Sequence, residues 1–488
     1  MQKIFKFIKI SIVGMLLLSS IGEATTILPQ HCLDYIAKYG TQPITLSQLK
    51  KKIANNEDVT KVNTCLITDM SKLFKDKANF NQDIGNWDVS EVNNMFGMFW
   101  GATSFNQYIG DWNVAKVENM GFMFLVATNF NQYIGDWNIS KVNNMDEMFS
   151  SAKNFNQYIG DWDVSKVEDM KHMFWGAENF NEYIGDWDVS KVKNMSYMFR
   201  DTKKFNQYIG DWNVSKVEKM EGMFWGTEEF DQYIGDWDVS HVTNMHSMFR
   251  NTKKFNHYIG GWNVSNVGYM GDMFHNATLF NQYIGDWDVS NVKSMSVMFG
   301  KTKNFNQYIG DWDVSKVKNM ANMFWESEKF NQYIGDWDVS SVTGMGAMFM
   351  DSVAFNQYIG DWDVTSVGSM YRMFAGAKRF NSYIGDWDVS GVYSMSSMFE
   401  NTEKFNQYIG DWDVSNVMSA SKMFYGAKKF NSYIGNWNVS KVRYIKEMFA
   451  YSKDFKQYIC DWTPTSVRPH SDLNTIFVGT SYPYSCNW

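Results

Sequence analysis

A 25-residue repeat fills most of this chain and constrains its fold more than any other feature. With Phe80 as position 1, the unit 80–104 reads FNQDIGNWDVSEVNNMFGMFWGATS. The pattern returns every 25 residues, without insertion, in fifteen consecutive units that end at residue 454. Upstream, 67–74 matches the second half of a unit, and a sixteenth start at Phe455 breaks down after Trp462. An unbroken short period predicts a solenoid in which each coil stacks on the one before it.

Apolar residues recur at fixed positions of the unit and predict its core. They are phenylalanine at 1 and 20, isoleucine at 5, tryptophan at 8, valine at 10 and 13, and methionine at 16 and 19. The segments FNQYI and WDVSxV favour two short strands. The segment MxxMFxxA has helical spacing and predicts one or two turns of helix. Asparagine at position 2, as in Asn106 and Asn131, is expected to form an amide ladder along the stack.

The beginning of the chain has the features of a secretory signal peptide. Lysines at 3, 6 and 9 precede a short apolar run, and Gly22-Glu23-Ala24 supplies small residues at a cleavage site. The alternative is an uncleaved membrane anchor, but spanning requires about 20 apolar residues, roughly twice this run. No other stretch is apolar enough to span a membrane. The predicted organisation is a signal peptide (1–24), an N-terminal cap with a half-repeat (25–79), fifteen repeats (80–454) and a C-terminal cap (455–488).

Four cysteines flank the repeat array: Cys32 and Cys65 before it, Cys460 and Cys486 at its end. In an exported protein an even number of cysteines favours disulfides, which would staple the open ends of a solenoid. Local pairing within each end is the simplest of three connectivities. Free thiols or a zinc site are the alternatives, although no CxxC spacing supports zinc.

Composition and motifs argue against several classes of function. The formal net charge is −8 and no basic stripe is present, so nucleic acid is a poor candidate partner. His241, His246, His257 and His275 fall at different repeat positions, which argues against a metal or catalytic site. No phosphate-binding loop and no hydrolase motif occurs. We therefore expect no cofactor, no metal and no enzymatic activity.

The pattern FNQxIGxWDVSxVxNMxxMFxxA resembles the surface-protein repeat of BspA-like leucine-rich-repeat proteins over residues 80–454. The resemblance implies a leucine-rich-repeat-like β-solenoid on a secreted or cell-surface protein. It also implies adhesion, or binding of host or neighbouring-cell macromolecules. Tyrosine at position 4 departs from the family, in which aspartate is frequent, as in Asp83. No lipid-attachment cysteine or wall-sorting tail is recognisable.

Two exposed columns are the candidate binding surfaces. Position 21 varies most and is expected near the solvent face, with tryptophan and arginine, residue types that favour binding hot spots. Its candidates are Trp100, Trp175, Arg200, Trp225, Arg250, Trp325 and Tyr425. Position 4 forms a tyrosine stripe suited to protein or glycan contacts, unless it only covers the neighbouring coils. The stripe begins with Tyr108, Tyr133, Tyr158, Tyr183 and Tyr208 and continues to Tyr458.

Aspartate occupies position 7 in twelve of the fifteen units, and like charges stacked so closely must be offset. Hydrogen bonds to turn amides are the expected explanation, with nearby lysines or calcium as alternatives. For the whole chain, a binding or adhesion surface outside the cell is the favoured function. A passive stalk or a self-associating coat protein is the alternative.

Overall fold

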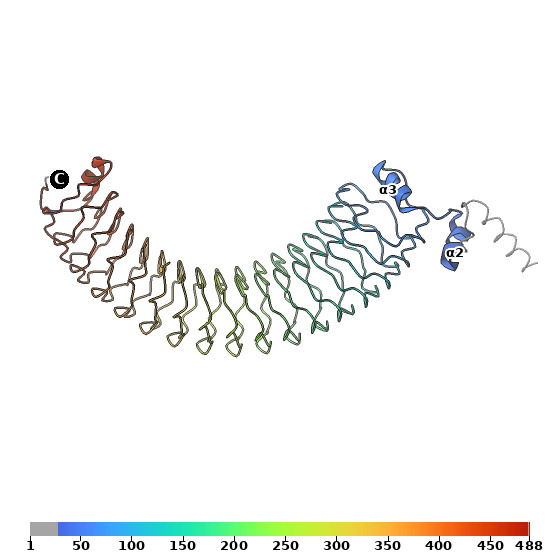
Figure 1. The fold of residues 1–488 in the computed structure, drawn as a ribbon, viewed down its shortest axis with the longest axis horizontal. Coiled ribbons are helices and arrows are strands. Elements are labelled where there is room, and N and C mark those ends of the chain that lie inside the picture. Colours follow the sequence, from blue (N-terminus) through green and yellow to red (C-terminus); the bar gives the residue numbers. More distant parts are fainter. Residues whose placement is uncertain (1–27, 487) are drawn as a thin grey trace, which may run out of the picture.

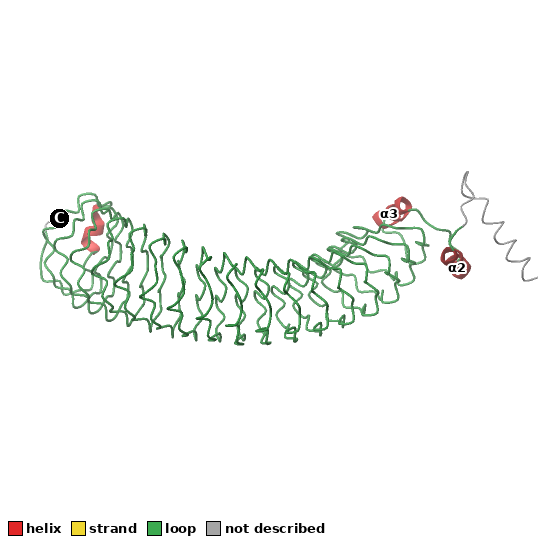
Figure 2. Cartoon of the chain, turned by 60° about the horizontal axis from the view of Figure 1, so that its bottom comes forward, coloured by secondary structure: helices red, strands yellow, loops and turns green. Residues whose placement is uncertain are grey.

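The computed structural model describes residues 28–486 and 488 as a single curved solenoid (Figures 1 and 2). Helices α2 (Gln30–Tyr39) and α3 (Leu46–Ala54) precede the coils, and the 3₁₀ helix η1 (His470–Thr475) follows them. The signal peptide expected at 1–24 lies outside the described residues. Among the residues that are described, no helix has the length and apolarity needed to cross a membrane.

The coils are built from turns, not from the two strands and the helical turn that the sequence predicts. Between residues 80 and 454 the structure has only isolated parallel bridges, which join position 15 of consecutive coils. One such series runs from Asp169 to Asn194 and on to Lys219. No strand forms at FNQYI in these coils, where the amide at position 2 donates to a side chain and the amide at position 1 closes a turn, as where that of Phe205 donates to the carbonyl of Thr202. The backbone amide of Asn206, for example, donates to Oδ1 of Asn181 in the preceding coil, at 2.8 Å.

Two consecutive β-turns replace the predicted helical turn. In one coil the amide of Met198 donates to the carbonyl of Met195, and that of Thr202 donates to the carbonyl of Phe199. The third residues of these turns, Tyr197 and Asp201, have φ of 57° and 55°. Left-handed φ costs a non-glycine residue about 1–2 kcal/mol, and it prevents helix continuation. The conformation frees alternate amides to donate to the next coil, as Tyr197 does to the carbonyl of Glu221 at 2.7 Å.

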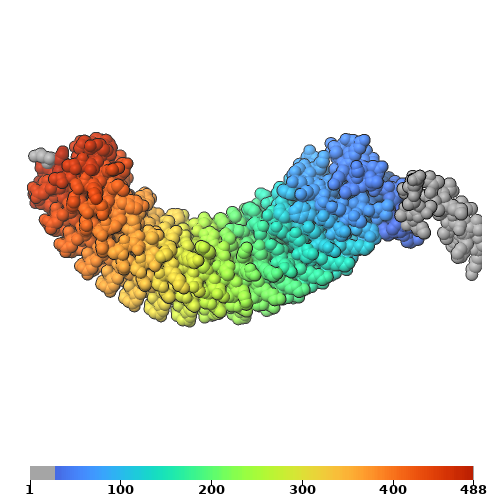
Figure 3. Space-filling model, viewed as in Figure 1, coloured from blue at the N-terminus to red at the C-terminus, as the bar shows by residue number. Residues whose placement is uncertain are grey.

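Unequal spacing between coils curves the solenoid. Equivalent ring centroids in adjacent coils lie 5.7 Å apart for Phe174 and Phe199, at position 20. The separation rises to 6.1 Å at position 1, between Phe180 and Phe205. It reaches 6.4 Å at position 8, between Trp187 and Trp212. The hydrogen-bonded turns therefore lie inside the arc and the tryptophans lie toward its outside. We call positions 15–22 of all coils the concave face; Figure 3 shows the hollow inner side of the arc.

The core is a set of ladders that run the length of the stack. The apolar positions are buried from the first coils to the last. The indole of Trp212 donates from Nε1 to the carbonyl of Ile184 in the preceding coil, at 3.1 Å, and this bond recurs along the array. The hydroxyl of Thr202 likewise donates to the carbonyl of Phe174 at 2.6 Å. The asparagines at position 2 do form a hydrogen-bonded series, but each Oδ1 accepts from the backbone amide of the next coil and not from a side-chain amide, as the expected amide ladder would require.

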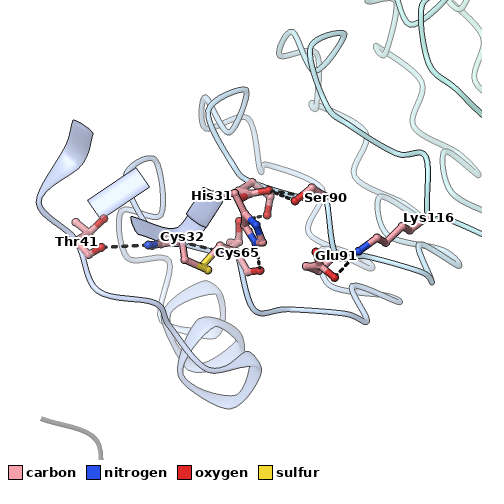
Figure 4. Close-up of polar contacts among 10 residues, drawn as sticks. His31, Cys32, Thr41, Cys65, Ser90, Glu91 and Lys116 are labelled. Carbon is pink, nitrogen blue, oxygen red and sulfur yellow. Dashed lines mark hydrogen bonds and ion pairs between the residues drawn. A yellow bond between two sulfur atoms is a disulfide. The ribbon is translucent and has the colours of Figure 1, made fainter. Parts of the chain in front are cut away.

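Disulfides close both ends with the predicted local pairing. Cys32 bonds to Cys65, which fastens α2 to the half-repeat (Figure 4), and Cys460 bonds to Cys486. This pairing removes the thiolates that a zinc site would need. Phe477 continues the phenylalanine ladder of position 20, since its ring lies 5.8 Å from that of Phe449. The C-terminal segment thus covers the last coil with an aromatic ring placed where the next coil would have one.

Candidate functional site

The concave face carries the side chains of four highly variable repeat positions, 17, 18, 21 and 22. Each left-handed turn residue lies at position 18 or 22, so the backbone there is uniform while the side chains differ. Position 21 is less exposed than expected, because its side chains are buried or half-buried in every coil. Neighbouring coils lie so close on this face that their side chains pack against each other.

The structure brings four of the seven predicted residues of position 21 into one ladder. The Arg200 guanidinium carbon lies 4.9 Å from the centroid of Trp175 and 3.8 Å from that of Trp225. Arg250 lies over Trp225 as well, at 4.7 Å. We call Trp175, Arg200, Trp225 and Arg250 the central ladder. Its alternation of indole and guanidinium is a series of cation–π contacts.

The remaining three predicted residues lie elsewhere on the concave face, and each also meets a cation. The ammonium of Lys75 lies 3.6 Å from the ring centroid of Trp100. That of Lys301 is 4.4 Å from the ring of Trp325, and that of Lys422 is 5.1 Å from the ring of Tyr425. Sequence reasoning missed these lysines. Lys75 could have been found, because it stands 25 residues before Trp100 and so occupies the same repeat position.

The two arginines of the central ladder differ in their polar partners. Arg250 donates from Nη1 to Asp272, which also lies 3.4 Å from Nδ1 of His275. Burial alone would raise the pKa of the Asp272 carboxyl, but His275 and Arg250 hold it below its usual value. Arg200 has only a loose ion pair, 3.4 Å from Nε to Oδ2 of Asp201. Within the described residues its buried Nε has no hydrogen-bond partner.

A second polar cluster lies nearby on the concave face, at Asp146, Glu147 and His172. Their ligand-type atoms lie within 4.8 Å of one another, so the group is a candidate to hold a metal ion. Burial raises the pKa of both carboxyls and lowers that of the imidazole. Lys171 Nζ lies 3.7 Å from Asp146 and pairs with its charge across coils, and His172 Nδ1 lies within hydrogen-bond distance of Glu147, at 3.2 Å. The group is thus one ion pair stacked beside one hydrogen-bonded contact.

The tyrosine stripe lies away from the concave face and is held by aspartate. The Tyr208 hydroxyl donates to Oδ1 of Asp211 at 3.0 Å, and the equivalent bond recurs in most coils. This bond raises the pKa of Tyr208. Most members are exposed; Tyr208 retains 38% of its accessible surface. No stacking of one stripe tyrosine on the next is found among residues 28–486, so the structure does not support a self-stacking ladder.

The stripe also explains the aspartates of position 7. They accept from tyrosine hydroxyls, which corrects the expectation that turn amides offset their charge. Position 9 has the expected capping role instead, as where the amide of Ser215 donates to Oδ1 of Asn213 at 3.2 Å. A methyl group at Gly210 would lie 2.6 Å from both the Tyr208 hydroxyl and the carbonyl oxygen of Tyr233. Glycine at position 6 is therefore required by the tyrosine side chain of its own coil and by the backbone of the next coil.

The family described as "Mycoplasma protein of unknown function, DUF285" matches this chain five times, at residues 45–162, 153–257, 226–320, 298–407 and 381–482. No curated protein matches the chain.

Three solved structures show weak similarity. The TLR13–ssRNA13 complex has a TM-score of 0.21 and 11% identity, covering 83% of this chain and 57% of that one. The plant peptide hormone receptor RGFR1 in complex with RGF2 has a TM-score of 0.19 and 8% identity, covering 91% and 89%. A leucine-rich-repeat protein of Leptospira interrogans has a TM-score of 0.16 and 6% identity, covering 87% and 95%.

Proposed function

The chain belongs to the DUF285 family, and on that premise we propose that it is an extracellular binding protein whose concave face holds a macromolecular partner. The observation that carries the proposal is the distribution of variation. The ladders of the core repeat almost without change, whereas positions 17, 18, 21 and 22 differ from coil to coil on one continuous face. Repeat proteins build partner surfaces in this way, and tryptophan and arginine are the residue types enriched at binding hot spots.

Several features support a location outside the cell. The first 24 residues have the pattern of a signal peptide, and both cysteine pairs form disulfides, which persist in oxidising compartments. The resemblance to BspA-like surface proteins supports adhesion to host or neighbouring-cell macromolecules. The proposed partner is a protein or a glycan, the proposed location is secreted or cell-surface, and the proposed role involves no catalysis.

A structural role is the second candidate, and the tyrosine stripe favours it. Tyrosines at one position of fifteen successive coils present a regular, self-similar surface. Regular surfaces of that kind suit lateral packing of identical solenoids into a stalk or coat. A partner surface would be expected to vary along its length, as the concave face does.

Two matched variants of the mature chain, 25–488, separate these functions. The concave variant carries Trp175→Ser, Trp225→Ser and Trp325→Ser; the stripe variant carries Tyr183→Ser, Tyr208→Ser and Tyr233→Ser. Retention of labelled protein on host cells and immobilised matrix proteins is compared with self-association by light scattering, after circular dichroism confirms folding. The binding proposal expects retention by the wild type and the stripe variant and loss in the concave variant. Self-association without heterologous retention would overturn it in favour of a structural role.

A further inference from the structure

Arg200, at the centre of the concave face, differs from the other arginine of the central ladder. Arg250 is neutralised by a hydrogen bond to Asp272. The Arg200 guanidinium is held between two indoles, at 4.9 Å and 3.8 Å. In the described part of the chain its acidic contact is the loose ion pair from Nε to Asp201, 3.4 Å long, and Nε has no hydrogen-bond partner. The side chain keeps 27% of its accessible surface, so the result is a stacked, partly exposed guanidinium.

We propose that Arg200 is the anchor for a carboxylate of a bound polypeptide, supplied by an acidic side chain or a free C-terminus. This inference rests on the proposed concave binding face and names the chemistry that it recognises. A guanidinium presents parallel N–H donors that match the two oxygens of a carboxylate. Stacking between Trp175 and Trp225 fixes its plane before the ligand arrives, which lowers the entropy cost of binding.

The surrounding charges favour a single carboxylate over a polyanion. Three carboxylates lie on the same face: Asp201 in the coil of Arg200, Glu221 one coil further and Asp272 three coils further. Glu221 accepts hydrogen bonds from the hydroxyl of Tyr197 and from Asn244, so it stays in place beside the ladder. A nucleic acid or a densely charged glycan would bring further negative charges against these carboxylates. One carboxylate directed at Arg200 avoids that repulsion.

The indoles of the ladder favour a polypeptide over a sugar acid. Sugars bind tryptophan by stacking an apolar ring face on the indole, but the faces of these indoles are already occupied. Trp225 has Arg200 and Arg250 over it, at 3.8 Å and 4.7 Å. Trp175 has Arg200 and the imidazole of His172, whose centroid lies 5.1 Å away. The partly exposed group is the Arg200 guanidinium, which suits a carboxylate on a flexible side chain.

The test uses a fluorescein-labelled hexapeptide with one glutamate among five glutamines as the probe, hexaglutamine as its uncharged counterpart, both amidated at the C-terminus, and hexagalacturonate as the glycan arm. Anisotropy titrations are run on the full mature chain. Arg200→Lys keeps a cation between the indoles but loses the fork, and Arg200→Gln loses both. Arg379→Gln removes the same charge from an exposed site at position 25, off the concave face. Tryptophan fluorescence and circular dichroism confirm that each variant is folded.

The one-glutamate peptide is expected to bind at least about tenfold more tightly than hexaglutamine, the effect of one charge-assisted hydrogen bond. Arg200→Lys and Arg200→Gln should each weaken binding of the one-glutamate peptide by about tenfold or more, and Arg379→Gln by less than about twofold. Equal binding of the two peptides, or wild-type affinity of Arg200→Lys, would overturn the inference. Tighter, Arg200-dependent binding of hexagalacturonate would overturn the choice of a polypeptide.

The retention assay distinguishes failure of this inference from failure of the proposed function. If the concave variant loses retention while Arg200→Lys is retained like the wild type, the concave face is the binding surface and Arg200 is not its anchor. If the wild type is not retained on any host cell or matrix protein, the proposed function itself fails.

Discussion

Two adjacent glycines, Gly260 and Gly261, provide a direct test of the packing at the tyrosine stripe. They occupy positions 6 and 7 of one coil, and Gly261 stands where most coils have aspartate. A methyl group built on Gly260 would lie 2.5 Å from the carbonyl oxygen of Tyr283 in the next coil and 2.6 Å from Cε2 of Tyr258. A methyl group built on Gly261 would meet nothing within 4 Å. The same substitution is thus placed in a tight and in an open site, one residue apart.

The two clashes at Gly260 differ in cost. Tyr258 is 46% exposed and has no aspartate partner in its coil, so its ring can move into solvent. The carbonyl of Tyr283 cannot retreat as easily, because Ile284 beside it is completely buried. An ordinary contact would require the carbonyl to move by nearly an ångström. Overpacking of this kind costs about 1–3 kcal/mol.

Gly260→Ala is therefore expected to destabilise the protein by about 1–3 kcal/mol. Gly261→Ala should be neutral or stabilise it by about 0.4–1 kcal/mol, because alanine restricts the unfolded chain without strain in the folded one. Gly235→Ala, in a coil where Tyr233 does bond to Asp236, should lose that hydrogen bond in addition. Its cost should exceed that of Gly260→Ala by about 0.5–1.5 kcal/mol.

The assay is urea denaturation of the three variants, with amide hydrogen exchange to place the effect. Exchange is needed because neighbouring coils of a repeat array can open without the rest. Gly260→Ala should speed exchange in its own coil and in the coil that contains Tyr283. Equal stability of Gly260→Ala and Gly261→Ala would refute the argument that close backbone approach requires glycine at position 6.

The other predictions concern the core, the caps and pH. Ala420 stands where most coils have methionine at position 16, and it lines a small apolar cavity. Ala420→Met should therefore raise the free energy of unfolding by about 1–3 kcal/mol. The control Ala427→Met, at a completely buried position, should lower the free energy of unfolding because it overpacks the core. Replacing Cys32 and Cys65 by serine removes a disulfide that joins residues 33 apart and should lower the free energy of unfolding by about 3.7 kcal/mol. Thermal unfolding measures this loss, and faster amide hydrogen exchange in the first coils locates it. Hydrogen bonds to aspartate raise the pKa of stripe tyrosines such as Tyr208. The free energy of unfolding that these bonds contribute is therefore complete below the pKa of tyrosine in the unfolded chain, about 10, and is lost as pH rises through the higher pKa of the folded protein. Stability that is flat through this alkaline range, with tyrosinate absorbance followed in parallel, would contradict the stripe geometry.

Much of the fold could be predicted from the repeat, because a strict period fixes which residues stack. The apolar positions and the asparagine series follow from identical residues that recur 25 apart, and the local disulfide pairs follow from two cysteines at each end of the array. Local propensity was a poorer guide. The sequence WDVSxV favours a strand and MxxMFxxA a helix, yet hydrogen bonds between coils outweigh these preferences and produce turns with left-handed residues such as Tyr197.

The candidate site depended on tertiary structure. The sequence by itself determined that position 21 varies and that it is rich in tryptophan and arginine. Only the folded chain decided that Trp175, Arg200 and Trp225 contact one another and that position 21 is half-buried. The reason is the spacing of the coils, which is shortest on the concave face, so that side chains 25 residues apart become neighbours there. Only the folded chain shows that Arg250 donates a hydrogen bond to Asp272, 22 residues away, whereas Arg200 has a loose ion pair with Asp201.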